Sequence, residues 1–359
     1  MAHDLVIVEQ GVRLGLDKEQ LVLYKGEGIL RKTRLQDLSQ VLLLGPVELT
    51  AAARNRLMRK GIDVVFLTTR GEYVGRMSGE QSANGSLRMA QYRLCLNSEQ
   101  ALKIAVSMLK GKLSNQRTVL LRQQRRLENE AVASALAGMR RMLNKLEQVQ
   151  TIEQLMGHEG QAAALYFGVF PQLILASDIA MRGRSKRPPR DPVNAALSFG
   201  YTILTRLMET TVLTVGLDPY VGCLHQARPG LPALVLDLIE EFRPVLVDSL
   251  VLRLFNKGQL KACDFYQPKA WKAAEAILAA ESDEWELPEA EPDERPAIYL
   301  AETGRKLFFQ AFYERLRDTR YYPLLDQNTS LRRIMEQQVY QLGRVIQGEA
   351  PEYLPFVLR

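Results

Sequence analysis

The pattern of apolar residues changes near residue 80, and this change constrains the fold more than any other feature. Before it, short runs of β-branched and apolar residues alternate with turn-forming Gly, Asp, Lys and Glu, which predicts strands. After it, apolar residues recur at helical spacing over long stretches. We therefore predict an α+β, two-domain fold. A small β-rich domain at 1–80 is followed by a linker at 81–90 and a larger all-α domain at 91–359.

The expected elements can be placed along the chain. One helix is predicted inside the β domain, with Thr50 as its N-cap and Gly61 in the left-handed position after it. Thr151 is suited to cap another helix that begins near Ile152. Strands are expected at 5–8, 12–16, 20–24, 29–35, 41–44, 63–67 and 72–77, and further helices at 194–215, 232–243 and 329–346.

The segments 41–44 and 63–67 are continuously apolar, so both faces of their sheet must be covered. One helix is too little to cover them. We expect a second copy of the β domain to supply the missing layer, because two-fold pairing is the commonest way to form a dimer. The alternative is that the helical domain folds back over the sheet.

Composition excludes several classes of protein. The chain has 359 residues, a net charge of +6 and three widely spaced cysteines, which excludes a disulfide framework and a four-thiolate zinc site. It has no apolar run of 18 residues, and its N-terminus lacks the features of a secretory signal, so we expect no membrane span and a cytoplasmic location. Eight acidic residues against one basic residue mark 281–296 as an acidic stretch in an otherwise basic chain, which suits a polyanionic ligand.

Carboxylates occur where the chain is otherwise apolar. Asp237, Glu240 and Glu241 lie in the segment PALVLDLIEEFRP, whose other positions are apolar on most sides of a helix. A helix of this kind is expected to be buried, and its carboxylates need partners. A divalent metal is one solution, and ion pairs to Arg228 or Arg243 are the other.

Two further residues complete the candidate site. His225 lies in a Gly- and Pro-rich loop just before this helix, where an imidazole can reach a metal or a phosphate. Glu159 begins EGQAAALYF, a run of small and apolar residues in which a lone carboxylate is costly. Histidine together with carboxylates suits Mg²⁺ or Mn²⁺ in phosphate chemistry, and differs from a structural zinc site.

Basic residues gather in the segment 182–190, and a charged loop of this kind can follow a phosphate backbone. The helical stretch 103–126 is a second basic segment, although such a run is more often a solvated face. The chain has no GxxxxGK[ST] loop, which disfavours an ATP-driven motor. The predicted DNA-binding residues are Arg182, Arg184, Lys186, Arg187 and Arg190.

In combination, these segments closely resemble the CRISPR-associated integrase family, the universal first protein of the CRISPR adaptation module. The resemblance spans about residues 5–260 and leaves out the acidic stretch. It depends on five segments in this order: VLLLGPVELTAAARNRLMRKGIDVVFLTTRGEYVGR (41–76), EGQAAALYF (159–167), PPRDPVNAALSFGYTIL (188–204), GLDPYVGCLH (216–225) and LVLDLIEEFRPVLVD (234–248).

The resemblance implies a prokaryotic protein with a catalytic helical domain and a β domain that dimerises. It implies that Glu159, His225 and Glu240 bind the metal, with Asp237 as the second choice for the last ligand. The implied reaction is attack by the 3′-hydroxyl of a DNA fragment on a repeat boundary, which inserts a spacer into a CRISPR array in antiviral defence. The implied partners are double-stranded DNA and a small ferredoxin-like protein. A DNA-binding assembly protein with a structural metal site, and a metal nuclease that acts alone, remain as alternatives.

Overall fold

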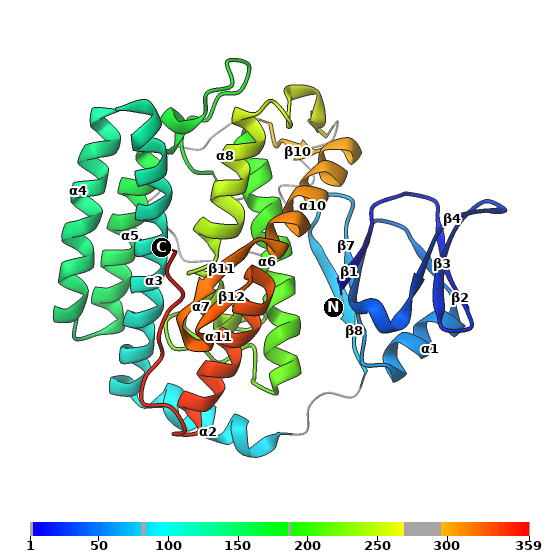
Figure 1. The fold of residues 1–359 in the computed structure, drawn as a ribbon, viewed down its shortest axis with the longest axis horizontal. Coiled ribbons are helices and arrows are strands. Elements are labelled where there is room, and N and C mark those ends of the chain that lie inside the picture. The colour runs from blue at the N-terminus through cyan, green and yellow to red at the C-terminus, as the bar shows by residue number, and fades with distance from the viewer. Residues whose placement is uncertain (1–2, 80–83, 186–187, 269–295, 359) are drawn as a thin grey trace.

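A computed structural model describes residues 3–79, 84–185, 188–268 and 296–358 of the chain. A β domain lies beside a larger helical domain, as predicted (Figure 1). The β domain contains two four-stranded sheets, in the orders β1-β5-β7-β8 and β4-β3-β2-β6. Its strands are β1 (His3–Ile7), β2 (Arg13–Asp17), β3 (Gln20–Lys25), β4 (Gly28–Arg34), β5 (Leu38–Leu44), β6 (Glu48–Leu49), β7 (Asp63–Leu67) and β8 (Tyr73–Met77).

The helix predicted inside the β domain is α1 (Ala51–Arg59). Thr50 caps it, because the backbone N–H of Ala53 donates to the Thr50 hydroxyl at 3.3 Å. Gly61 follows the helix with a φ of +66°, in the left-handed region expected for it. The first sheet is parallel from β1 through β5 to β7, and β8 closes it as an antiparallel edge. The segments expected as strands therefore all pair in sheets.

Strand β5 is buried on both faces, and two different layers cover it. Val41 and Leu43 pack into a core that the two sheets share with α1. Leu42 and Leu44 point the other way and join the core of the helical domain. The helical domain therefore supplies the covering layer, which is the alternative to a second copy of the β domain. The need for a covering layer thus gives no support to dimerisation.

Polar contacts also join the two domains. The Thr210 hydroxyl, from the helical domain, donates to the Gln40 side chain of β5 at 2.7 Å. The guanidinium of Arg332 lies 2.8 Å from the carboxylate of Asp4, which is almost fully buried. These contacts fix the β domain against the helices.

The helical domain begins earlier than predicted. Asn84 caps α2 (Gly85–Leu96), so residues 85–90 of the expected linker are helical. The other helices are α3 (Ser98–Leu127), α4 (Glu130–Lys145), α5 (Ile152–Val169), α6 (Pro192–Val215), α7 (Ala233–Ile239), α8 (Ser249–Asn256), α10 (Glu302–Arg317) and α11 (Leu331–Ile346). Two small antiparallel pairs accompany them, β9 (Phe265–Tyr266) with β10 (Tyr299–Leu300) and β11 (Thr319–Tyr322) with β12 (Gln327–Ser330).

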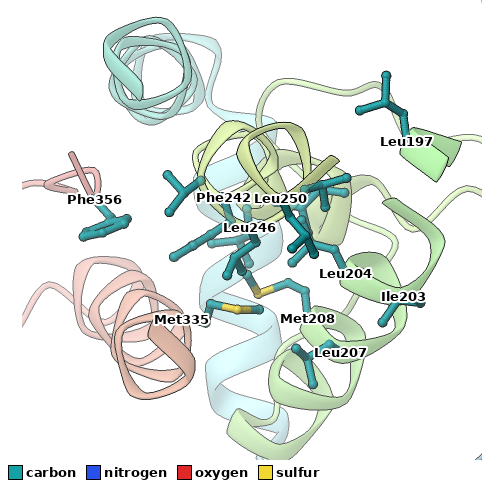
Figure 2. Close-up of a cluster of buried hydrophobic side chains, with 14 of the residues drawn as sticks. Leu197, Ile203, Leu204, Leu207, Met208, Phe242, Leu246, Leu250, Met335 and Phe356 are labelled. Atoms are coloured by element: carbon teal, nitrogen blue, oxygen red, sulfur yellow. The ribbon is translucent and has the colours of Figure 1, made fainter. Parts of the chain in front are cut away.

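Pro244 follows the end of α7 and is the second residue of the next helical segment. It lies in a π-helical turn, Arg243–Asp248, which connects the end of α7 to α8. Apolar side chains of this turn pack against α6, α11 and the segment after α11 (Figure 2). The rings of Phe242 and Phe356 stack there with their centroids 5.6 Å apart. In the part of the chain that is described, no helix is long and apolar enough to cross a membrane.

Candidate active site

Two of the predicted carboxylates meet at one buried lysine. Glu159 lies on α5 and Lys112 on α3, and Glu240 is the C-cap residue directly after α7. The Lys112 ammonium lies 2.5 Å from Glu159 Oε1 and 2.7 Å from Glu240 Oε2. Burial disfavours the charged lysine, but the two carboxylates outweigh burial and raise the pKa of Lys112. The carboxylates therefore face the same point from two different helices.

Glu240 is almost fully buried and remains ionised. Its Oε1 lies 3.0 Å from the Arg243 guanidinium. Burial would raise the pKa of Glu240, but Arg243, Lys112 and His225 outweigh it and lower the pKa to about 2. Its Oε2 lies 2.7 Å from the Lys112 ammonium. Each oxygen of Glu240 is thus paired with one cation, Oε1 with Arg243 and Oε2 with Lys112.

His225 is oriented by Asp237. The Asp237 carboxylate is fully buried, and its Oδ1 lies 2.7 Å from Nδ1 of His225. A carboxylate can only accept, so Nδ1 carries the proton of the neutral ring and Nε2 keeps its lone pair. Burial lowers the pKa of His225, but the hydrogen bond and charge of Asp237, with Glu240, raise it overall. The imidazole therefore presents Nε2 as its acceptor, on the side of the ring away from Asp237.

The hydrogen bonds of Asp237 already occupy both of its carboxylate oxygens. Oδ2 accepts the backbone N–H groups of Cys223 and Leu224 at 2.6 and 2.9 Å, and Oδ1 accepts that of His225 at 2.9 Å. With the imidazole, four donors share its two oxygens. These contacts favour Glu240 over Asp237 as the third ligand and give Asp237 the task of positioning His225.

Glu241 points away from Glu240, as the helical spacing predicts. The Tyr353 hydroxyl and the backbone N–H of Phe356 donate to its carboxylate, each at 2.7 Å, and Gln338 donates at 2.9 Å. Burial raises the pKa of Glu241 to about 7, although these hydrogen bonds oppose the rise. Glu241 therefore anchors the segment that follows α11 and takes no part in the candidate site.

Asn115 completes this anchor from α3. Its amide donates to the carbonyls of Glu241 and Phe356 at 2.7 and 2.8 Å, and its oxygen accepts from the Leu358 backbone at 2.8 Å. The segment 353–358 is thus hydrogen-bonded to Asn115 and to Glu241, which is the neighbour of Glu240 in the chain. The position of Glu240 depends on α3, α7 and this segment together.

A second buried acidic group lies on the π-helical turn. Asp248 accepts from the hydroxyls of Tyr166 and Tyr201 at 3.0 and 2.5 Å. Burial raises the pKa of Asp248 to about 6, against these hydrogen bonds and the charges of Arg184 and Arg243. The sequence interpretation missed this cluster. The one signal in the sequence was an aspartate, Asp248, that follows the apolar residues of VLVD.

The residues fit a divalent cation, although they are not yet gathered around one point. Across the described ranges, no three His, Cys, Asp or Glu side chains are close enough together to hold an ion. The Lys112 ammonium instead bridges two of the candidate ligands, Glu159 and Glu240. Two carboxylates from different helices that meet at one buried cation, together with an imidazole acceptor, are the donor set expected of a Mg²⁺ or Mn²⁺ site.

The basic loop is only partly a surface feature. Arg182 is exposed, whereas Arg184 donates to the Ser185 carbonyl at 2.6 Å and to the Asn194 side chain at 2.7 Å. The Arg184 guanidinium also lies 5.5 Å from the centre of the Tyr201 ring. Arg184 therefore fastens the loop to the start of α6. Arg190 is half-buried, and Lys186 and Arg187 lie outside the described residues, as does 281–295 of the acidic stretch.

Lys112 was missed as a site residue, because the sequence interpretation assigned it to a basic surface track along 103–126. Its spacing carried a signal. Ala105, Met108 and Leu109 are buried, and Lys112 follows them at positions i+7, i+4 and i+3. A lysine in the apolar stripe of a helix indicates a buried counter-ion, and Glu159 and Glu240 are its partners.

Known proteins are similar to this chain over nearly its whole length. The sequence model of the family described as CRISPR associated protein Cas1 matches residues 5–282. The "CRISPR-associated endonuclease Cas1 2" of Rhodospirillum rubrum is 36% identical, over 99% of this chain and 98% of the relative. The "CRISPR-associated endonuclease Cas1 1" of Chlorobaculum tepidum is 32% identical, over 99% and 98%.

Solved structures share the fold. A Cas1 protein from Thermotoga maritima aligns with a TM-score of 0.77 and 23% identity over the whole of both chains. A casposase bound to an integration product aligns with a TM-score of 0.80 and 21% identity, over all of this chain and 95% of that one. A chain of a Cas6-RT-Cas1–Cas2 complex aligns with a TM-score of 0.80 and 24% identity, and this protein spans 36% of it. The chain belongs to the family of CRISPR associated protein Cas1.

Proposed function

We propose that the protein is a divalent-metal-dependent DNA endonuclease and integrase, which inserts short DNA fragments as spacers into a CRISPR array. The observation that carries the proposal is the convergence of Glu159 and Glu240 from different helices, beside a histidine whose Nδ1 is held by Asp237. Family membership supports it, because the similar proteins of R. rubrum and C. tepidum are named endonucleases. The casposase bound to an integration product has the same fold.

In this proposal, Glu159, His225 Nε2 and Glu240 hold Mg²⁺ or Mn²⁺. A divalent ion held by these residues would supply Lewis-acid chemistry, which would polarise the scissile phosphodiester and stabilise charge on the leaving 3′ oxygen. Asp237 keeps the proton on Nδ1, so that Nε2 remains an acceptor. Arg243 holds Glu240 Oε1 and leaves Oε2 for the site. One phosphodiester is exchanged for another, so the reaction needs no ATP, in keeping with the missing phosphate-binding loop.

We further propose double-stranded DNA, a second copy of the chain and a small ferredoxin-like protein as partners. The Cas6-RT-Cas1–Cas2 complex supports a protein partner by similarity of fold. Exposed Arg182, with Arg190 and the undescribed Lys186 and Arg187, is proposed to contact the phosphate backbone. The mass of the full-length chain in light scattering tests the homodimer. The isolated β domain is a poor test, because it would expose the face that the helical domain covers.

One observation favours a second candidate. Lys112 bridges Glu159 and Glu240, so the carboxylates are neutralised without any metal. A DNA-binding assembly protein with a degenerate metal site would have such an arrangement. Such a protein would bind DNA and its partner but would not join DNA ends.

A strand-transfer assay separates the candidates. The full-length chain, its partner, Mn²⁺ and a DNA fragment with free 3′-hydroxyls are incubated with a supercoiled plasmid that carries a repeat. We expect joined products from the wild type. Glu159→Gln and His225→Asn should abolish joining and keep DNA binding, measured by fluorescence anisotropy. Glu153→Gln, an exposed position on α5, is the matched control and should join DNA normally.

Joining by the two site variants at the wild-type rate would refute the proposed integrase. DNA binding without joining in the wild type would favour the assembly protein. Cleavage without joining in the presence of the partner would favour a nuclease that acts alone.

A further inference from the structure

Lys112 lies between the two carboxylates of the candidate site. Its side chain is 7% exposed, and its ammonium lies within 2.7 Å of an oxygen of both Glu159 and Glu240. These are two of the three side chains expected to bind the ion. The lysine therefore lies between the same two carboxylates that a divalent ion would bridge.

Charge balance explains why a cation is needed there. Glu159 and Glu240 bring two negative charges into a largely buried space, and Lys112 and Arg243 bring two positive charges. Removing the ammonium from the metal-free protein would leave buried carboxylates without compensation, which is strongly unfavourable. Arg243 cannot replace Lys112, because it contacts the other oxygen of Glu240.

A lysine and a divalent ion cannot share these oxygens, because two cations that close together repel each other in a poorly hydrated space. The ammonium is carried on a flexible four-carbon stem, so it can move aside while α3 stays in place. By contrast, Arg243 grips Glu240 from the far side and is compatible with a bound ion.

We propose that Lys112 is the internal counter-ion of the metal-free site, and that a divalent cation must displace it from Glu159 and Glu240 in order to bind. Lys112 then sets the metal concentration at which the site fills. The inference depends on the metal site of the proposed function and adds a positioning residue to it.

Mn²⁺ binding tests the displacement directly. Calorimetry and the electron paramagnetic resonance signal of free Mn²⁺ give the Kd for the full-length wild type, Lys112→Met and Lys112→Gln. Removing the competing charge should lower the Kd by about tenfold or more, corresponding to about 1.4 kcal/mol. The metal-free variants should also melt at a lower temperature than the wild type, and saturating Mn²⁺ should raise their melting temperature more.

Lys112→Arg provides a test in the opposite direction. Its guanidinium can bond both carboxylates in a fixed fork and is harder to displace, so the Kd for Mn²⁺ should rise about tenfold or more. This variant keeps the charge and so does not leave the carboxylates unpaired. Lys110→Met is the matched control, because Lys110 is exposed on the same helix and its ammonium lies 3.6 Å from Glu147. Its Kd should equal that of the wild type.

A Kd unchanged in the folded Lys112 variants, or weaker binding by Lys112→Met or Lys112→Gln, would overturn the displacement while leaving the metal site intact. If Lys112→Met and Lys112→Gln do not fold, an unchanged Kd in Lys112→Arg is sufficient to overturn it. Failure of the wild type and all variants to bind Mn²⁺ would refute the metal site itself, and the inference with it.

Discussion

Replacing Asp237 by asparagine should reverse the tautomer of His225. Oδ2 of Asp237 accepts two backbone N–H groups, and Oδ1 accepts one N–H and faces Nδ1 of the ring. Asparagine has only one acceptor oxygen, so that oxygen can face either the Cys223 and Leu224 N–H groups or the N–H and ring of His225, but not both. If the oxygen faces the Cys223 and Leu224 N–H groups, the new NH₂ faces the N–H of His225 and the ring.

The number of unsatisfied donors decides the orientation. With the oxygen toward Cys223 and Leu224, one buried N–H loses its acceptor, at a cost of about 1–3 kcal/mol. In the opposite orientation two buried N–H groups lose theirs, at roughly twice that cost. The first orientation is therefore favoured. In it the NH₂ donates to Nδ1, so the proton of the neutral ring must move to Nε2 and the lone pair that we propose to bind the metal is lost.

Three measurements follow from this variant. The ¹⁵N chemical shifts of the imidazole, at a pH that keeps the ring neutral, should show Nδ1–H in the wild type and Nε2–H in Asp237→Asn. The chain has only three histidines, so the spectrum is simple to assign. The free energy of unfolding in urea should fall by about 1–3 kcal/mol. The Kd for Mn²⁺ should rise about 10–100-fold, as for other residues that orient a metal-binding histidine.

Asp218→Asn is the matched control for the same loop. Asp218 accepts from the Tyr220 backbone and the Tyr92 hydroxyl, and it is not bonded to the histidine. Its tautomer spectrum should match the wild type. If Asp237→Asn keeps the proton of His225 on Nδ1, the argument from donor counting is wrong. Direct contact between Mn²⁺ and Asp237 in a crystal structure would contradict the assignment of Asp237 as an orienting residue.

Three other outcomes are expected. Gly222→Ala should lower the free energy of unfolding by about 1–3 kcal/mol in urea, because the new Cβ would lie 2.5 Å from Asp237 Oδ2; an unchanged value would contradict this close approach. Arg182→Ala should weaken binding to all DNA sequences alike and reduce the salt slope by about one, whereas Arg184→Ala should mainly lower the melting temperature. Burial raises the pKa of Asp248 from 3.8 to about 6, so between about pH 4 and pH 6 this group ionises in the unfolded chain but stays protonated in the folded protein. The free energy of unfolding should therefore fall by about 3 kcal/mol over that range. Asp248→Asn should abolish this loss, measured by urea unfolding at both ends of the range.

Local signals explain which parts of the fold could be predicted. The strands of the β domain and the caps Thr50 and Thr151 depend on residues a few positions apart, and the structure confirms them. Strand β6 has two residues, which is too short for any periodicity. The linker was placed too far along the chain because Gly85 and Ser86 resemble loop residues, although Asn84 caps a helix there.

The candidate site was predictable only in part, for a physical reason. A carboxylate among apolar residues is visible in the sequence, and this identified Glu159 and Glu240. Its counter-ion can come from any other element, so nothing near Glu159 in sequence indicates Lys112, 47 positions earlier. Likewise, the sequence placed Asp237 among the possible ligands, and only its contacts with the loop at 223–225 show its orienting role.

The anchor at Asn115 has a consequence for the order of folding. The hydrogen bond between Asn115 and the Leu358 backbone joins residues 243 positions apart, and that between Glu241 and the Phe356 backbone joins residues 115 positions apart. Contacts between such distant residues form late, because a long loop must close before they contribute. On the ribosome, α3 and α7 emerge well before their last partners do. A nascent chain therefore has the carboxylates of the site before it has the support that fixes them, and the site is completed only when residues 353–358 have been made.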